Sequence, residues 1–241
     1  MQKDTVSSYR IMHANGVFMA SRAVNERIKH VESLISMIDL HEVELVGPLS
    51  EVFSHAEGID ANSLLSSHLG LVSKALEALG DAEREVELEA SDDQQYRDAR
   101  DAAIAKLSTT LNDTRLLFEA AYSKELAAEY GFTEDLPRSP ASLKKSAEAS
   151  VSALRTRALE ETSPYGFDLD LAPLADRIET EIIPLITALE DVAREAREIR
   201  EAIDARNEAM ANFDETFRAV AAILHSYFVL VGRPDLAAMI S

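Results

Sequence analysis

"LAPLADRIETEIIPLITALEDVAREAREIREAI" is the sequence of residues 171 to 203, and its apolar residues recur at alternating steps of three and four. This spacing places them on one face of an α-helix, as in the seam between packed helices. The same phase resumes after Arg206 and continues to Tyr227. Glycine and proline are sparse, with 8 and 7 among 241 residues, whereas helix-favouring Ala, Leu and Glu recur throughout. The sequence therefore predicts an all-α protein.

A motif in this region also occurs in the first half of the chain. "YRDARDAAIAKL" (96–107) resembles "AIDARNEAMANF" (202–213), and matching their Asp-Ala-Arg triplets aligns apolar positions on both sides. The aligned positions are Leu107 with Phe213, Leu111 with Phe217 and, after a four-residue gap, Glu125 to Ala128 with Asp235 to Ala238. A long shared pattern whose gaps roughly preserve helical phase predicts internal duplication. A chance alignment of two Ala-rich amphipathic helices remains the alternative.

Turn-forming residues suggest where the two copies meet. "GFTEDLPRSP" (131–140) contains one glycine and two prolines, and it ends with Ser139 as a helix N-cap before Pro140. Asp170 is a second predicted cap, before the helix that begins near Leu171. We therefore expect two tandem antiparallel helical bundles, residues 1–137 and 138–241. The first also includes an additional N-terminal helix around Arg22 to Asp39.

Each bundle is expected to contain a coiled-coil-like helical hairpin. Ser91, Asp92 and Asp93 predict a capping turn between two helical arms in the first copy. The second copy has no such residues between Ala193 and Arg206, so its arms form either a tight hairpin or one long helix. We favour the hairpin, because an uninterrupted helix over 171–231 would be about 90 Å long. Pro184 should kink this helix.

Four sequence segments are similar to those of uncharacterised bacterial helical-bundle proteins with a repeated helical-hairpin unit. The segments are "GIDANSLL" (58–65), "ARDAAIAKL" (99–107), "YGFTEDLPRSP" (130–140) and "LVGRPDLAAMIS" (230–241). The resemblance implies a helical fold, and it implies no activity.

Composition excludes several classes of function. The 43 acidic residues outnumber the 24 lysines and arginines, giving a net charge of −19, so we expect no nucleic-acid partner. The chain has no cysteine, which excludes disulfides and thiolate chemistry, and we expect a cytoplasmic protein. The longest uncharged apolar stretch, Ala219 to Gly232, has 14 residues, whereas about 20 are needed to span a bilayer. The N-terminus lacks the pattern of a signal peptide.

Two Glu–His pairs near the N-terminus are the candidate metal ligands. Glu26 with His30, and Glu51 with His55, are each four residues apart, which places each pair on one helix face. Di-iron bundles use a three-residue Glu–His spacing, and helical zinc proteases require a His-Glu-x-x-His motif that "LHEVELVG" (40–47) does not complete. The pairs are also typical of charged helix surfaces.

The remaining candidate residues favour structural roles. His68 and His225 lie beside seam leucines, and we expect them to bond backbone carbonyls at the edge of the core. Asp168 and Asp170 begin an incomplete calcium-loop pattern, since Pro173 occupies the position that needs glycine. The sequence has no phosphate-binding loop and no nucleophile elbow. It therefore identifies no catalytic, cofactor-binding or metal-binding residue.

The leading hypothesis is a non-catalytic structural or protein-interaction protein, with a protein partner or self-association. Residues 80–101 contain nine acids against three arginines, which form either a solvated stretch or an acidic docking surface for a basic partner. One alternative is a metal-dependent helical-bundle enzyme that uses Glu26, His30, Glu51 and His55. Another is a membrane-active protein that exposes Ala219–Val231 together with Ile11–Ala20, although the sequence does not favour membrane binding.

Overall fold

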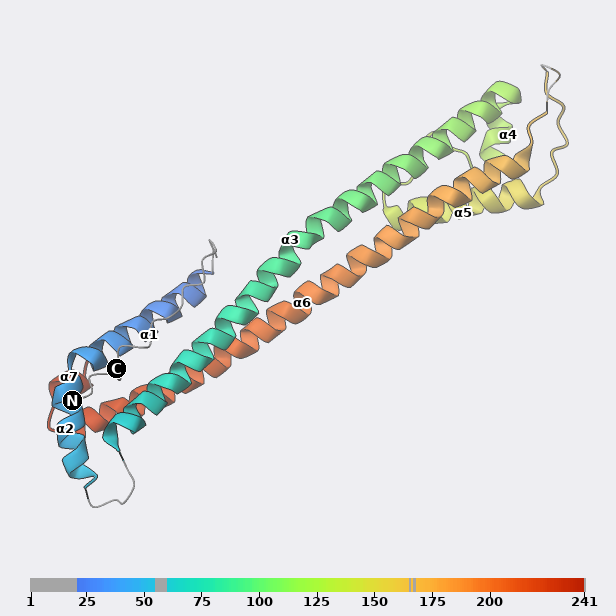
Figure 1. Ribbon diagram of the computed structural model, residues 1–241. Coiled ribbons are helices and arrows are strands. Elements are labelled where there is room, and N and C mark those ends of the chain that lie inside the picture. Colours follow the sequence, from blue (N-terminus) through green and yellow to red (C-terminus); the bar gives the residue numbers. More distant parts are fainter. Residues whose placement is uncertain (1–20, 55–59, 165, 167, 241) are drawn as a thin grey trace. The chain divides into compact units, whose positions relative to one another are not determined.

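A computed structural model describes residues 21–54, 60–164, 166 and 168–240 (Figure 1). All the regular elements within these residues are α-helices, which confirms the predicted all-α class. The helices are α1 (Arg22–Leu40), α2 (Glu42–Val52), α3 (Ala61–Ala121), α4 (Lys124–Glu129), α5 (Pro140–Thr156), α6 (Leu171–Leu230) and α7 (Pro234–Ala237).

The predicted helix starts are confirmed where they are described. Ser139 accepts a hydrogen bond from the Ser142 amide at 3.1 Å, and Pro140 begins α5. Asp170 accepts from the Ala172 amide at 3.1 Å at the start of α6. The predicted N-terminal helix is α1, whose first turn is capped by the Ser21 hydroxyl. These side chains satisfy amides that have no partner within the helix.

α3 is a single helix of 61 residues, so the turn predicted at Ser91, Asp92 and Asp93 is wrong. No glycine or proline lies between Gly80 and Gly131, and isolated Ser and Asp residues weaken a helix without ending it. The polar side chains here find partners along the helix, since Arg97 binds Asp93 at 2.7 Å. Such pairs stabilise an exposed helix surface.

α6 is also continuous, over 60 residues, and the hairpin predicted between Ala193 and Arg206 is wrong. This stretch consists mainly of Ala, Glu and Arg, which are all good helix formers. The helix continues through Pro184, whose ring lies on the exposed side. The predicted apolar seam of α6 is most deeply buried towards the two ends of the helix. Its buried members there are Ile178, Ile182, Leu185, Phe213, Val220 and Leu224.

The helices pack into two compact units, and the long helices contribute to both. Unit 1 contains the described residues up to Leu88 and from Ile199 onward, and unit 2 comprises Glu89–Glu198. The predicted boundary between residues 137 and 138 falls within unit 2. Each unit takes helices from both predicted bundles, because α3 and α6 do not fold back on themselves.

In unit 1 the first part of α3 runs beside the last part of α6, and α1 covers both (Figure 1). α1 buries four apolar residues: Val24, Val31, Leu34 and Ile38. Leu69 and Leu79 of α3 and Leu224 and Phe228 of α6 belong to the same core. Arg27 of α1 binds Asp214 of α6 through two hydrogen bonds of 2.8 and 2.6 Å.

In unit 2 the last part of α3 packs against α5 and the first part of α6. After α4 the chain reverses at Gly131, which has a φ of +86°. A Cβ atom at this position would lie 2.8 Å from Ser150 Oγ, so a side chain would be both strained and obstructed. The reversal brings Phe132 back against Phe118, with ring centroids 5.3 Å apart.

Candidate functional site

Glu26 and His30, the first of the N-terminal Glu–His pairs, make separate structural contacts. Glu26 accepts a hydrogen bond from Arg22 Nε at 3.0 Å, and the His30 ring lies 6.3 Å from the ring of Phe217. Glu51 is an exposed residue near the end of α2, and His55 lies outside the described residues. Within the part of the chain that the structure describes, three potential metal ligands come together only in unit 2.

That group consists of Glu89 on α3 and Glu195 and Glu198 on α6. Their ligand oxygens lie within 4.8 Å of one another, and Glu195 is only 4% exposed. Carboxylate groups suit hard cations such as Mg²⁺ and Ca²⁺. Sequence reasoning missed this group, because it forms only when α3 and α6 run side by side. The only local signal is the three-residue spacing of Glu195 and Glu198.

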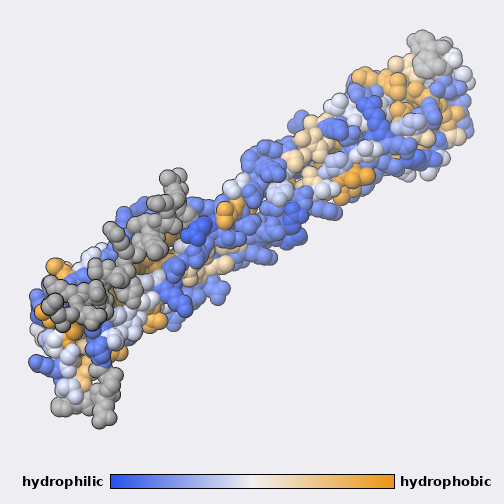
Figure 2. Space-filling view, in the orientation of Figure 1, coloured by the Kyte–Doolittle hydropathy of each residue, from blue (hydrophilic) through white to orange (hydrophobic). Residues whose placement is uncertain are grey.

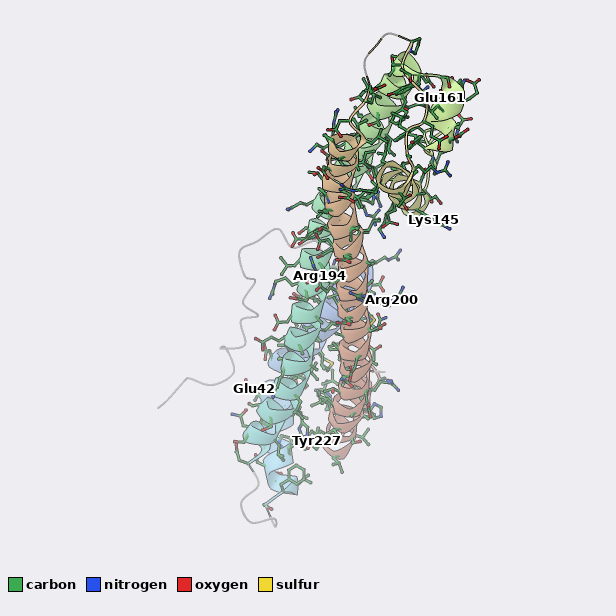
Figure 3. The ribbon with its side chains drawn as sticks, turned by 90° about the vertical axis from the view of Figure 1, so that its right-hand side faces the viewer. Glu42, Lys145, Glu161, Arg194, Arg200 and Tyr227 are labelled. Atoms are coloured by element: carbon green, nitrogen blue, oxygen red, sulfur yellow. The ribbon has the colours of Figure 1, made fainter. Side chains whose placement is uncertain are left out.

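Arg194 supplies positive charge beside these carboxylates. Its Nη2 lies 3.4 Å from Glu195, its Nε lies 3.9 Å from Glu198, and its Nη1 donates to Asp191 at 2.8 Å. The hydrogen bond to Asp191 is the main cause that raises the pKa of Arg194. Figure 3 shows Arg194 on the side of α6 that faces α3, where its guanidinium carbon is 5.7 Å from the centre of the Tyr96 ring. The carboxylates and Arg194 thus form an ionic network.

A second buried carboxylate, Glu83, joins three helices of unit 1. It is 4% exposed and accepts a hydrogen bond from the Ser21 amide, at the start of α1, at 2.7 Å. Arg206 Nη1 of α6 lies 3.8 Å from its other oxygen. A buried charge needs such partners to offset the loss of hydration. Arg206 of the repeated Asp-Ala-Arg motif thus has a packing role.

The two histidines beside the seam lie at the edge of the unit 1 core. His225 Nδ1 is 3.0 Å from the carbonyl oxygen of Ala237, which confirms the predicted carbonyl bond. His68 packs edge-on against Tyr227, with ring centroids 5.9 Å apart. Its Nδ1 has no hydrogen-bond partner among the described residues, so the carbonyl bond predicted for His68 is not found there.

Unit 2 has two shallow surface hollows. The first, of about 370 Å³, is lined by Glu148, Val151, Glu179, Ile182 and Ile183. The second, of about 360 Å³, is lined by Leu126, Glu129, Tyr130, Arg157, Ala158, Glu160 and Glu161. Burial raises the pKa of Tyr130 in the second hollow, which keeps its phenol neutral. Both hollows are open to solvent.

Unit 1 carries exposed apolar side chains on two segments, the junction of α1 and α2 and the end of α6 with α7. Leu40 and Val43 are 78% and 87% exposed, and Figure 2 shows apolar surface at the end of unit 1 that contains α2 and α7. Large apolar side chains that gather on a surface often mark a binding site. We name the following residues the corner surface: Leu40, Val43, Val229, Leu230 and Met239.

Arg233 connects the two segments of the corner surface. It forms an ion pair with Glu44 of α2. It also donates two hydrogen bonds, of 3.0 and 2.8 Å, to Asp235 of α7. These bonds raise the pKa of Arg233 and lower that of Asp235 to about 2. Arg233, held by two carboxylates, therefore links α2 to α7.

No helix within the described residues is both long enough and apolar enough to cross a membrane. The segment that the membrane-active hypothesis would expose, Ala219–Val231, includes Val220, Leu224 and Phe228, all of them core residues of unit 1. No protein-family model, curated protein or solved structure matches this chain.

Proposed function

We propose that this chain is a non-catalytic structural or protein-interaction protein. The observation that carries the proposal is the corner surface, where large apolar side chains are exposed on an otherwise strongly acidic chain. Exposing such side chains forgoes the free energy of burial, so they are expected to be covered in a complex.

The buried polar groups support the same proposal, because they contribute to helix packing. Thr114 donates to the Thr110 carbonyl at 2.8 Å, and Ser150 donates to the Ser146 carbonyl at 3.2 Å. Glu83 caps the start of α1, as described above. The threonine and serine contacts satisfy hydroxyl groups inside the helical cores.

The proposal is tested by cross-linking the protein in an extract of its native cells. We expect discrete cross-linked complexes that contain a second protein or further copies of the chain, identified by size-exclusion chromatography and mass spectrometry. Recovery of the protein only as an uncross-linked monomer, at its native concentration, would contradict the proposal.

Metal analysis of purified, untagged protein distinguishes the metal-dependent enzyme from the proposed interaction protein. We expect no stoichiometric metal, because Glu26 is bound by Arg22 and His30 packs on Phe217. Stoichiometric zinc, iron or manganese that is lost in a His30→Ala, His55→Ala variant would favour a metal-dependent enzyme. Metal that survives this change would point instead to Glu89, Glu195 and Glu198.

We also propose that the chain arose by duplication. α3 and α6 have 61 and 60 residues, and each is followed by a short helix, α4 or α7. Aligned residues that are buried in both copies include Leu107 with Phe213, Phe118 with Leu224, Leu126 with Leu236, and Ala127 with Ala237. Each unit combines the first part of one long helix with the last part of the other, as an exchange between two copies would produce.

Two further expectations belong to this proposal. The resemblance to repeated helical-hairpin proteins of bacteria supports a helical scaffold, although the long helices replace the expected hairpins. A chain without cysteine suits the reducing cytoplasm, which is where we propose that the protein acts.

A further inference from the structure

The sequence around the corner surface is strongly negative. From His30 to Ser73 the chain contains seven carboxylates and no lysine or arginine, and this stretch includes all of α2. From residue 219 to 241 the only lysine or arginine is Arg233, which is held by Glu44 and Asp235. Among the described residues of these two segments, a ligand therefore meets carboxylates and a single arginine that Glu44 and Asp235 already hold.

The apolar and acidic side chains alternate closely at the junction of α1 and α2. Leu40 is the last residue of α1, and Val43 is the second residue of α2. Asp39 is an exposed neighbour of Leu40, and Glu42 is a half-buried neighbour of Val43. A ligand that covers both apolar side chains would place its own polar groups beside these carboxylates.

We propose that the corner surface binds a basic amphipathic segment of a partner protein. The apolar face of that segment would cover Leu40 and Val43, and its lysines or arginines would pair with Asp39 and Glu42. This inference rests on the proposed interaction function, and it adds the surface and the chemical class of the partner.

Charge decides between the possible occupants of the surface. A second copy of the chain would bring another net charge of −19, and an anionic membrane would also repel the carboxylates. A basic segment is attracted over distances of about 8 Å at physiological ionic strength. It also leaves the Arg233 bonds to Glu44 and Asp235 in place.

The test uses a fluorescent synthetic peptide that forms an amphipathic helix with leucines on one face and lysines on the other. Two control peptides accompany it, one with glutamate in place of lysine and one with the same residues in scrambled order. Binding to the full chain is measured by fluorescence anisotropy at 150 mM and 500 mM salt.

Two pairs of variants locate the binding site. Leu40→Ser with Val43→Ser removes the apolar contacts, and its control is Leu116→Ser with Leu117→Ser, which changes exposed leucines of unit 2. Asp39→Lys reverses one charge beside Leu40, and its control is Asp92→Lys on unit 2, where the side chain is also exposed. Circular dichroism melts check that each variant folds.

We expect the Leu40, Val43 variant to weaken binding at least tenfold and Asp39→Lys to weaken it several-fold, while both controls bind like the parent. The glutamate peptide should not bind, and the scrambled peptide should bind weakly. Equal losses in the variants and their controls would overturn the proposal, because they would show general attraction to an acidic chain.

Two further results would assign the surface to another occupant. A concentration-dependent dimer, seen by light scattering and lost in the Leu40, Val43 variant, would overturn the proposal in favour of a second copy. Binding to phosphatidylcholine vesicles that the same variant loses would overturn it in favour of a lipid surface.

The peptide experiment also distinguishes a failure of the surface assignment from a failure of the proposed interaction function. If the peptide does not bind but native extracts still yield a cross-linked complex, the surface assignment fails and the interaction function stands. If the peptide does not bind and native extracts yield no cross-linked complex, the surface assignment and the interaction function both fail.

Discussion

The two long helices end in different ways. At the end of α3, the Phe118 ring lies 5.1 Å from that of Tyr130 and 5.3 Å from that of Phe132, so the returning chain covers the helix end with aromatic rings. At the end of α6, Phe228 is buried beneath α7, but Val229 and Leu230 are about half exposed. One end is closed by apolar packing, and the other keeps apolar surface in contact with water.

This difference follows from what comes after each helix. Gly131 reverses the chain after α4, so that α4, α5 and the segment between them all cover the end of α3. Gly232, with a φ of +76°, ends α6, and α7 follows it. At this end Arg233 holds Glu44 of α2 and Asp235 of α7, while Val229 and Leu230 stay about half exposed.

The largest expected effect tests the end of α3, which is closed by apolar packing. Phe118→Ala should lower the free energy of unfolding of unit 2 by about 3–5 kcal/mol, because it leaves a cavity among buried rings. Urea unfolding followed by circular dichroism, with hydrogen exchange to locate the loss, measures this change. Leu116→Ala, on the same helix but half exposed, is the control and should change stability by about 0.5 kcal/mol or less. Equal effects of the two changes would show that the ring cluster does not close this end.

A somewhat smaller effect is expected at the end of α6, which keeps apolar side chains exposed to water. Leu224 is fully buried in unit 1, so Leu224→Ala should cost about 2–5 kcal/mol, whereas the half-exposed Leu230→Ala should cost little. The same unfolding experiment measures both. If Leu224→Ala instead melts like the parent while liposome binding falls, this segment is not core and the membrane-active hypothesis gains.

The smallest expected effect concerns the charges at the open end. Hydrogen bonds from Arg233 are the main cause that lowers the pKa of Asp235 from its ordinary 3.8 to about 2. Because the folded-state pKa is lowered, this contact stabilises the fold above pH 3.8 and is lost as the pH falls through about 2. In Arg233→Ala, NMR titration should find the Asp235 pKa back near 3.8, with stability changed only slightly because Asp235 is exposed and Arg233 is only partly buried. A pKa that stays near 2 in this variant would contradict the assigned cause.

Local signals in the sequence predicted the helical class and several helix starts. Ser139, Pro140 and Asp170 act within one turn of their own helix, so their roles can be inferred without knowing what the helix packs against. The three-four spacing of Ile178, Ile182 and Leu185 likewise predicts burial without naming a partner.

Features that depend on pairing between distant segments were not predictable. The turn at Ser91 to Asp93 was inferred from polar residues, and the hairpin in α6 from the length of an uninterrupted helix, whereas both helices are continuous and pair with each other. Glu89 meets Glu195 only because of that pairing. The exposure of Leu40 and Val43 could not be inferred either, because it depends on which helices pack against α1 and α2.

The central claim is that α3 and α6 pair with each other and do not fold back as two hairpins, and zero-length cross-linking tests it most directly. Carbodiimide joins lysines to carboxylates that are already in contact, and Lys106 Nζ of α3 lies 3.1 Å from Glu181 Oε2 of α6. Mass spectrometry of the monomer fraction should therefore identify a Lys106–Glu181 linkage. A hairpin with its turn at Ser91 to Asp93 would instead bring Lys106 close to Glu77, and a Lys106–Glu77 linkage in place of the expected one would contradict the account.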